Sequence, residues 1–504
     1  MFCKVLSSAL CGVDAVPISV EADLSNGLPS FTIVGSVSSL VREAEDRVRT
    51  ALHNISISLP PKRITINLAP GYFRKDGTRF DLPIAAALLI ALDVIPPEPL
   101  QECMVLGELH LNGDTEGVSG ILPGVIMAKS SGIGKCVVPF ENANEAASVK
   151  DMEIIAVRSL SDLISWCRNT GPDLTFVHSE KRPDAGRAPD FAEMYGQETV
   201  KRASLIAAAG FHNILFSGPP GAGKSMAAKR IPTIMPPVTE DEKLEISKIY
   251  SVAGLLNDDC PVISERPFRA PHYSVSPQAL CGGGSIPVPG EITLAHKGVL
   301  FIDEIAEMPS QTLNQLRQPL EDKCITISRV SGRCTFPADF LLAAAMNPCP
   351  CGYYPDRNKC NCSEPEINRY RRRISRPILD RIDIKADVKG ISLNELRPEG
   401  RSETDSAAMR KKVVEVFEIQ KMRYENTDIS FNSALDPADI PAFCPLTPKA
   451  EALLRSAFDH FDLSARGYHK LLKVSRTIAD LDRCDKINEY HLSEALCFRH
   501  DIYR

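Results

Sequence analysis

One octapeptide constrains the fold of this chain more than any other stretch. Residues 218–225 read Gly-Pro-Pro-Gly-Ala-Gly-Lys-Ser and match the pattern G-x-x-x-x-G-K-[ST] at every fixed position. The apolar residues 213–217 before it are typical of a strand, and the residues after it are typical of a helix. This order predicts a phosphate-binding loop in an α/β sheet, in which backbone N–H groups surround the phosphates. The predicted ATP-binding residues are Gly218, Pro219, Pro220, Gly221, Ala222, Gly223 and Lys224, with Ser225 holding Mg²⁺.

A second acidic element follows about 80 residues later. Residues 298–304 read Gly-Val-Leu-Phe-Ile-Asp-Glu, a buried-strand pattern that ends in two carboxylates. Asp303 at the strand tip is placed to order the Mg²⁺ shell, and Glu304 beside it to polarise an attacking water. The pair therefore favours nucleotide hydrolysis over simple nucleotide storage.

Three further polar side chains are candidates for the same chemistry. Asn347 follows the apolar run 340–345, where it is placed to position the water. Arg381, in the stretch 378–383, has the charge to neutralise a γ-phosphate of a neighbouring subunit, although a local ion pair with Asp380 or Asp383 explains it equally well. Arg466 is a further candidate in the C-terminal segment.

A cysteine cluster stands out among the 16 cysteines of the chain. Cys349, Cys351, Cys360 and Cys362 form C-x-C-x₈-C-x-C, and four thiolates at such spacing can bind one Zn²⁺ tetrahedrally. Because four sulfurs leave no open coordination position, the predicted role is structural. A reduced cluster without metal, disulfides and an iron–sulfur cluster are the alternatives.

Length and patterning predict several α/β domains in 504 residues. Residues 1–170 mix strands, such as 31–34 and 63–68, with helices, such as 40–53, and residues 171–189 are a polar linker. Residues 190–395 alternate strands and helices as in a parallel sheet, and 396–504 are mainly helical, with a periodic stretch at 472–483. A hydrophobic content of 44% and a charged fraction of 24% exclude a disordered chain, and the net charge of −6 gives no sign of a generic polyanion binder. The longest apolar run, 83–92, is too short to cross a membrane, and the thiols suit a reducing cytoplasm.

Taken in order, these motifs resemble the AAA+ ATPases, in the branch that contains magnesium chelatase subunits and MCM helicases. Nearly the whole chain resembles the ComM/YifB family. The stretches that carry this resemblance are GLPSFTIVG (27–35), KRITINLAPG (62–71), RPFRAPHYSVS (266–276), NPCPCGYY (347–354) and SARGYHKLLKVSRTIADL (464–481). It implies a Lon-protease-like (S5-like α+β) N-terminal domain, a central AAA+ P-loop domain and a C-terminal helical lid.

The resemblance also implies roles for single residues. Lys224 and Ser225 correspond to Walker A, Asp303 and Glu304 to Walker B, and Asn347 to sensor 1. Arg381 corresponds to the arginine finger and Arg466 to the sensor 2 arginine, with Arg476 as the alternative. The segment Tyr195, Gly196, Gln197 matches the part of the family that lies near the adenine. Such ATPases are homohexameric rings, and this family is implicated in DNA branch migration during recombination and natural transformation.

Two regions are further candidates for DNA contact. Residues 324–336 read as a hairpin, and in this branch of AAA+ proteins a hairpin before sensor 1 projects into the pore, where Arg329 and Arg333 would meet DNA phosphates. In the N-terminal domain, the stretches matching the Lon catalytic pair lack the serine and carry Gly124 near the lysine position. The domain is therefore predicted to be non-proteolytic, with a basic surface at Lys62, Arg63, Arg74, Lys75 and Arg79.

The leading functional prediction is an ATP-driven motor on single-stranded or branched DNA. The main alternative is a magnesium-chelatase-type ATPase that remodels a protein partner. An ATP-dependent protease is disfavoured by the missing catalytic pair, and a nucleotide-gated scaffold by the carboxylates at 303 and 304.

Overall fold

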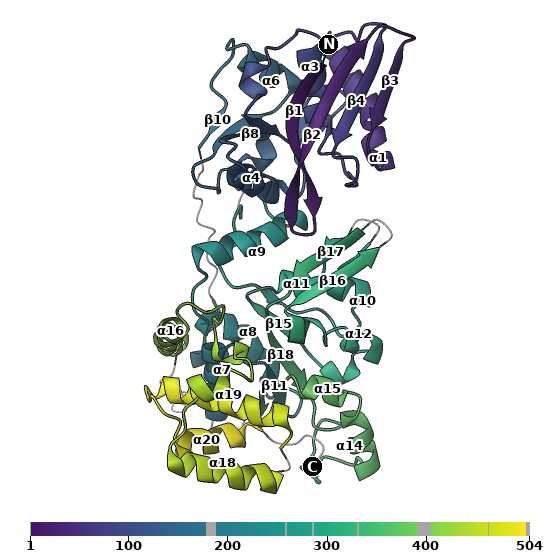
Figure 1. Ribbon diagram of the computed structural model, residues 1–504. Helices are drawn as coiled ribbons and strands as arrows, with labels where there is room; N and C mark the ends of the chain where they lie inside the picture. Colours follow the sequence, from purple (N-terminus) through teal and green to yellow (C-terminus); the bar gives the residue numbers. More distant parts are fainter. Residues whose placement is uncertain are drawn as a thin grey trace.

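The computed structural model describes residues 2–177, 188–257, 260–284, 287–329, 332–390, 405–461 and 463–499. Two separate β-sheets divide the molecule (Figure 1). An N-terminal sheet with its helices forms the upper body of the figure, and a parallel sheet with the remaining helices forms the lower body. Most of the predicted linker at 171–189 lies outside the described residues.

The N-terminal body is a mixed sheet of eight strands in the order β10-β9-β8-β5-β1-β2-β4-β3. A long antiparallel hairpin of β1 and β2 lies in its middle, and every residue of α3 is buried against these two strands. The strands are β1 Phe2–Cys11, β2 Asp14–Ser25, β3 Ser30–Val34, β4 Arg63–Ala69, β5 Cys103–Val105, β8 Lys135–Pro139, β9 Glu153–Val157 and β10 Thr175–Phe176. The helices are α1 Ser39–Arg42, α2 Ala44–Asn54, α3 Asp81–Ala91, α4 Ile121–Ser130, α5 Ala143–Ala146 and α6 Leu160–Cys167, and β6 Glu108–Leu109 pairs with β7 Thr115–Glu116.

The central sheet has five parallel strands in the order β12-β15-β18-β11-β19. These strands are β11 Ile214–Ser217, β12 Phe268–Arg269, β15 Val299–Ile302, β18 Leu341–Met346 and β19 Ile384–Asp387. The first strand of this sheet, β11, lies between the last two, so the strand order reverses beside it. Ligands of open α/β sheets bind at the carboxyl ends of strands at such a reversal, and the octapeptide begins where β11 ends.

Helices and a hairpin surround this sheet. The helices are α7 Glu198–Gly210, α8 Lys224–Ile234, α9 Glu240–Val252, α10 Pro277–Cys281, α11 Glu291–Leu294, α12 Ser310–Asn314, α13 Pro319–Asp322, α14 Glu364–Arg371 and α15 Arg376–Leu379. A small pair, β13 Gly282–Gly283 and β14 Val288–Pro289, lies beside α10 and α11, and β16 Cys324–Arg329 with β17 Gly332–Pro337 forms the predicted hairpin.

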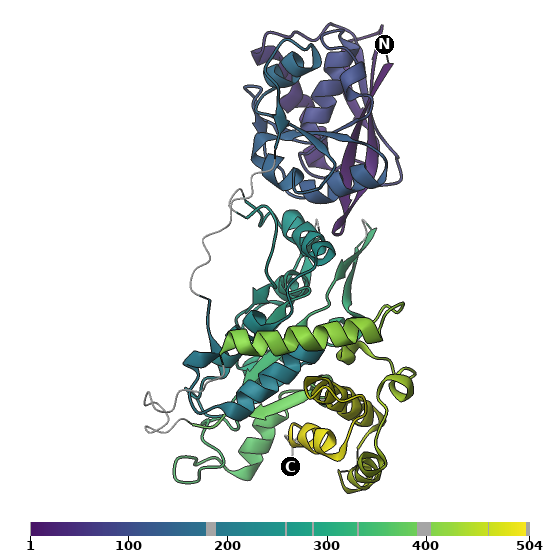
Figure 2. The same ribbon diagram turned by 90° about the vertical axis from the view of Figure 1, so that its left-hand side faces the viewer.

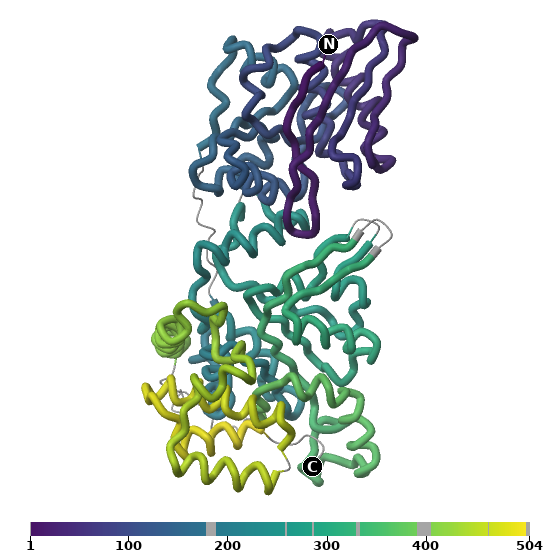
Figure 3. Tube along the Cα trace, in the orientation of Figure 1, coloured from purple at the N-terminus to yellow at the C-terminus, as the bar shows by residue number. Residues whose placement is uncertain are grey.

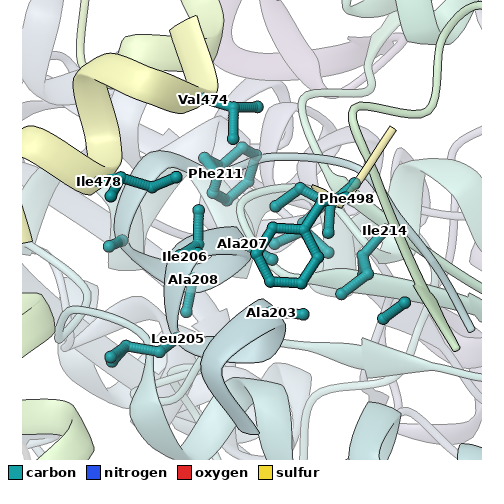
Figure 4. Close-up of a cluster of buried hydrophobic side chains, with 14 of the residues drawn as sticks. Ala203, Leu205, Ile206, Ala207, Ala208, Phe211, Ile214, Val474, Ile478 and Phe498 are labelled. Atoms are coloured by element: carbon teal, nitrogen blue, oxygen red, sulfur yellow. The ribbon is translucent and has the colours of Figure 1, made fainter. Parts of the chain in front are cut away.

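The C-terminal helices pack on the central sheet through α7. They are α16 Ser406–Arg423, α17 Ile440–Phe443, α18 Pro448–Phe461, α19 Ala465–Leu481 and α20 Glu489–Cys497. Figure 4 shows Ile206 and Phe211 from α7 and its end against Val474 and Ile478 of α19. Figure 2 shows α16 lying lengthwise across this body. One apolar core therefore joins the central sheet, α7 and α19.

The two bodies meet at α9 and at the tip of the β1–β2 hairpin. The Gly120 backbone N–H donates to the Ser251 carbonyl at 2.8 Å, near the end of α9. Val13, at the hairpin tip, packs with Phe336 of β17. The tube in Figure 3 shows this tip reaching down toward the lower body. The N-terminal body therefore contacts the lower body at α9, the helix that follows α8, and at β17.

Most predicted elements are confirmed, and two differ in their bounds. The strands predicted at 31–34 and 63–68 correspond to β3 and β4. The helix predicted at 40–53 is interrupted at Glu43, between α1 and α2. The helix predicted at 472–483 begins at Ala465, capped by Ser464, so that Arg466 lies in its first turn. Within the described residues, no helix is long and apolar enough to cross a membrane.

Candidate nucleotide site

A cavity of about 370 Å³ opens where β11 ends and α8 begins. The loop between them turns through left-handed backbone at Gly221 and Gly223, with φ of 76° and 97°, which glycine adopts without a Cβ clash. The lining residues are Pro220, Gly221, Ala222, Gly223, Lys224, Ser225, Met226, Asp303, Glu304, Met346 and Asn347. The structure therefore brings both carboxylates and Asn347 to the phosphate-binding loop, as the strand order requires.

Lys224 lies buried at the centre of this cavity. Its Nζ donates to the Gly218 carbonyl at 2.6 Å, the Pro219 carbonyl at 2.9 Å and Asn347 Oδ1 at 2.9 Å. Burial lowers the pKa of Lys224, although the charge of Asp303 opposes this. The ammonium is thus held by neutral oxygens, and phosphate oxygens entering the cavity are stronger acceptors for it.

The Mg²⁺ ligands predicted from the sequence lie in contact. Ser225 Oγ donates to Asp303 Oδ2 at 2.7 Å. Asp303 directly follows β15, whose residues are all buried. A hydroxyl and a carboxylate at this position are oxygen ligands that suit Mg²⁺, which completes its shell with water and substrate phosphates. Glu304 follows in left-handed backbone, with φ of 49°, and its side chain lines the cavity rather than continuing the strand.

The segment predicted to lie near the adenine borders the same loop. Gln197 is buried, and its Nε2 donates to the Lys389 carbonyl at 2.6 Å and to the Ala222 carbonyl at 3.5 Å. Gly196 supplies a left-handed turn, with φ of 64°. Tyr195 is not among the residues that line the cavity. Contact of this segment with the adenine stays a prediction.

The two predicted arginines lie away from this cavity. The Arg381 carbonyl accepts from Asn213 Nδ2 at 2.9 Å, and Asn213 precedes β11, whereas the phosphate loop follows it. The four residues of β11 separate the two by about 13 Å along the strand. Arg381 and Arg466 both pair with Glu321 of α13. The suggested local pairs of Arg381 with Asp380 or Asp383 are wrong for the described residues, since Asp383 pairs with Lys470 at 2.8 Å.

The alternative sensor 2 residue is wrong on structural grounds. Arg476 is 1% exposed in α19 and pairs with Asp480 at 2.9 Å. Its Nη1 also donates to the Asp485 carbonyl at 2.6 Å. A guanidinium enclosed in this way stabilises the helical segment and has no access to a nucleotide.

The four cysteines of the cluster come together as a compact group. Their sulfur atoms all lie within 4.8 Å of one another, with Cys349 Sγ 3.3 Å from Cys351 Sγ and 3.7 Å from Cys360 Sγ. All four thiols are free, so the disulfide alternative is not present. A tetrahedral Zn²⁺ with Zn–S bonds of about 2.3 Å separates its sulfurs by about 3.8 Å, which this group fits with small shifts.

The predicted hairpin is confirmed, and the predicted basic surface is partly wrong. Arg329 pairs with Gly332 across β16 and β17, Arg333 is exposed, and the turn at 330–331 lies outside the described residues. In the N-terminal body, Lys75 and Arg79 are buried. Their charged groups donate to the carbonyls of Pro70 and Ser119, so these two residues cannot meet DNA phosphates.

Comparison with known proteins shows the family to which this chain belongs. Family models of magnesium chelatase subunit ChlI match residues 190–396 and 20–142, and a model of the ChlI C-terminal region matches 403–499. Competence protein ComM of Haemophilus influenzae is 42% identical over 501 residues, which cover 98% of this chain and 97% of that protein. This chain belongs to the ComM/YifB family. YifB of Salmonella typhimurium is 39% identical over 503 residues, 98% of this chain and 96% of YifB.

Membership of the ComM/YifB family and the chelatase matches indicate an AAA+ ATPase. Lon protease 2 of Bacillus subtilis is 29% identical over 162 residues, 30% of this chain and 29% of the protease. Gly124 stands near the position of the Lon lysine, and a Cβ there would lie 2.8 Å from Ser8 Oγ and 2.9 Å from Leu106 Cδ1, so a side chain at this position requires both neighbours to shift.

Two residues near the predicted sites of this ComM/YifB chain were not predicted from the sequence. Glu321 carries no motif, and only the tertiary structure shows that it holds Arg381 and Arg466. Gly352 follows the first cysteine pair and has φ of 88°, and a Cβ there would lie 2.7 Å from Pro220 Cδ in the phosphate loop. A glycine directly after C-x-C was a signal for a tight turn, but not for this contact.

Proposed function

We propose that this chain is an ATP-hydrolysing ring motor that acts on branched or single-stranded DNA, with branch migration as its activity. The observation that carries the proposal is the placement of Arg381 and the phosphate loop at opposite ends of β11. An arginine in this position cannot reach the γ-phosphate bound by its own chain. This position supports a role at a γ-phosphate held by a neighbouring copy.

A ring follows from this geometry if every copy uses the same contact. Such an interface is heterologous, since the cavity of one copy meets the arginine face of the next. Repeated around a closed rotation it gives a cyclic oligomer, and we propose the homohexamer that the family resemblance implies. Hydrolysis in such a ring is sensitive to the position of each neighbour, which is the basis of motor action.

The DNA substrate is supported by the hairpin and by the relatives. Arg333 on β17 is exposed beside the turn and pairs with Ser328, and Arg329 is the last residue of β16. Phosphate contacts of this kind are independent of sequence and weaken with salt. The relative from Haemophilus influenzae is named Competence protein ComM, and the family resemblance implies DNA branch migration in natural transformation. We therefore place the DNA in the pore, against the hairpins.

The chemistry assigns each group of the cavity a task. Lys224 binds the β- and γ-phosphates, Ser225 and Asp303 hold Mg²⁺, and Glu304 orients and polarises the attacking water. Asn347 links the water to Lys224, whose Nζ lies 2.9 Å from Asn347 Oδ1. Bound Mg²⁺ supplies neutralisation of the β- and γ-phosphate charge.

We also propose a structural Zn²⁺ held by Cys349, Cys351, Cys360 and Cys362. The mutual distances of up to 4.8 Å and the four soft thiols support this assignment. The cluster follows Asn347 directly in the chain, and Gly352 within it packs on Pro220. A metal here would fix the loop that carries Asn347 against the phosphate loop.

Steady-state hydrolysis of ATP, with and without a four-way DNA junction, tests the motor function. We expect several-fold stimulation by the junction, absent in Glu304→Gln, and loss of the stimulation in Arg333→Ala. Arg455→Ala is the matched control, because Arg455 is an exposed arginine of α18 paired only with Glu451 within the described residues. Hydrolysis indifferent to DNA would refute the motor and favour the chelatase-type alternative, an ATPase that remodels a protein partner.

Metal analysis of the purified chain tests the zinc site without any assay of activity. We expect one zinc per chain, and less than about a tenth of that in a Cys360→Ser, Cys362→Ser double variant. Cys497→Ser, at an exposed cysteine outside the cluster, is the control and retains the metal. Iron with sulfide in place of zinc would support the iron–sulfur alternative instead.

A further inference from the structure

Glu321 joins Arg381, the predicted arginine finger, and Arg466, the predicted sensor 2 arginine. Arg466 Nη2 donates to Glu321 Oε1 at 2.5 Å, and Arg381 Nη2 donates to Oε2 of the same carboxylate. The three residues lie on α13, after α15 and on α19, so 60 and 145 positions of sequence separate each pair. The Glu321 carboxylate therefore binds two guanidinium groups that come from distant parts of the chain.

The charge at this face is incompletely balanced. Two guanidinium groups share one carboxylate, so one positive charge is left over within the cluster. Arg381 is 11% exposed, and its Nε has no hydrogen-bond partner in the part of the chain that the structure describes. Glu321 itself is 49% exposed, and the two arginines hold its pKa below the ordinary value, with the hydrogen bond from Arg381 contributing most. Arg466 is 59% exposed, so the N–H groups of its guanidinium that Glu321 does not use are open to a larger anion.

A γ-phosphate matches these donors better than the carboxylate does. It carries three oxygens and more negative charge, and guanidinium groups bind phosphate through parallel N–H···O bonds. The pair of Glu321 with Arg466 is exposed on both sides, at 49% and 59%, and such a pair contributes at most about 1 kcal/mol. Arg381 is more enclosed, so the exchange at this arginine requires a phosphate that replaces the carboxylate directly.

We infer that Glu321 is a positioning residue that occupies the place of the γ-phosphate of a neighbouring copy and is displaced when that copy binds ATP. In the absence of the phosphate, the carboxylate holds Arg381 and Arg466 side by side and prevents their mutual repulsion. On ATP binding, the two arginines exchange Glu321 for the phosphate. This inference rests on the proposed function, in that it requires a site shared between copies.

ATP binding to the assembled chain in a Glu304→Gln background tests this exchange without hydrolysis or DNA. Glu321→Gln keeps the shape of the side chain but removes the charge that competes with the phosphate. We expect the dissociation constant for ATP to fall about fivefold, which corresponds to about 1 kcal/mol. Asp322→Asn removes the same charge at the next position of α13 and is expected to leave the dissociation constant within twofold.

Removal of both arginines distinguishes this inference from a purely structural role of Glu321. In an Arg381→Ala, Arg466→Ala background, Glu321→Gln is expected to change ATP affinity by less than twofold. Equal tightening with and without the arginines, or weaker binding in Glu321→Gln, would overturn the inference. Because binding is measured without DNA, failure of the DNA motor leaves this result interpretable. DNA-stimulated hydrolysis with an unchanged dissociation constant in Glu321→Gln would refute the inference alone.

Discussion

Replacement of Gly352 by alanine tests whether the cysteine loop supports the phosphate loop. The residue has φ of 88°, where a side chain costs about 1–2 kcal/mol. The added Cβ would also lie 2.7 Å from Pro220 Cδ and 3.3 Å from Pro220 Cγ. A proline ring cannot rotate away, and such overpacking costs about 1–3 kcal/mol. The two effects together predict a loss of about 2–5 kcal/mol unless the phosphate loop moves.

Movement of the loop would appear as weaker nucleotide binding. We expect the dissociation constant for ATP to rise at least tenfold in Gly352→Ala, together with a lower midpoint of urea unfolding. Gly132→Ala is the matched control, since Gly132 has φ of 77° but no atom within 4 Å of an added Cβ. It shares the backbone strain and lacks the contact. We expect it to lose about 1–2 kcal/mol and to keep its affinity for ATP.

Isothermal titration with ATP and urea unfolding of both variants separate the two contributions. The reasoning is refuted if Gly352→Ala loses no more stability than Gly132→Ala and binds ATP like the unaltered chain. In that case the cysteine loop does not press on Pro220, and the contact with the phosphate loop has no functional consequence.

Three further perturbations follow from the described contacts. Burial raises the pKa of Asp81 from 3.8 to about 6, although the hydrogen bonds from Arg47 lower it. The stability that the neutral carboxyl contributes is therefore fully present below pH 3.8 and is lost as the pH rises through 6. The free energy of unfolding, relative to Asp81→Asn, should therefore fall by about 3 kcal/mol from pH 3.5 to pH 7 in urea titrations, and a flat difference would contradict this. Asn347→Ala is expected to lower kcat for ATP hydrolysis about 100-fold with little change in ATP affinity, and unchanged kcat would exclude it from the reaction. Arg476→Ala should lower the free energy of unfolding by at least about 2 kcal/mol, because it leaves buried Asp480 with one partner fewer; unaltered thermal stability would contradict this placement.

The sequence predicted the cavity residues well because each one is tied to a strand end. The run 299–302 is apolar throughout and must be buried, so the next residue, Asp303, emerges at the carboxyl edge of the sheet. The same logic places Asn347 after β18 and Lys224 after β11. These predictions depend on local pattern and on the direction of parallel strands, both of which the sequence carries.

Side-chain burial in the N-terminal body was less predictable. Lys75 and Arg79 lie in a polar stretch that suggests a solvated surface, yet both are buried. Lys75 donates to the carbonyl of nearby Pro70, whereas Arg79 donates to the carbonyl of Ser119, 40 positions away. A local window of sequence contains no information about the segment around Ser119. Arg476 was misjudged for the same reason, since its partner Asp480 is near in sequence but the enclosure comes from the loop at Cys484 and Asp485.

What the sequence alone determined was the chemistry of one cavity, because glycines, carboxylates and strand ends at fixed spacing leave few arrangements. What only the tertiary structure decided was which side chains meet across the fold. Glu321 reaches Arg466 over 145 positions, and Gly352 meets Pro220 across two loops. Such contacts depend on the packing of α13, α15 and α19 around the sheet, and packing is a property of the whole chain. The sequence identified the residues of the nucleotide cavity, and the tertiary structure showed that Arg381 and Arg466 lie away from this cavity.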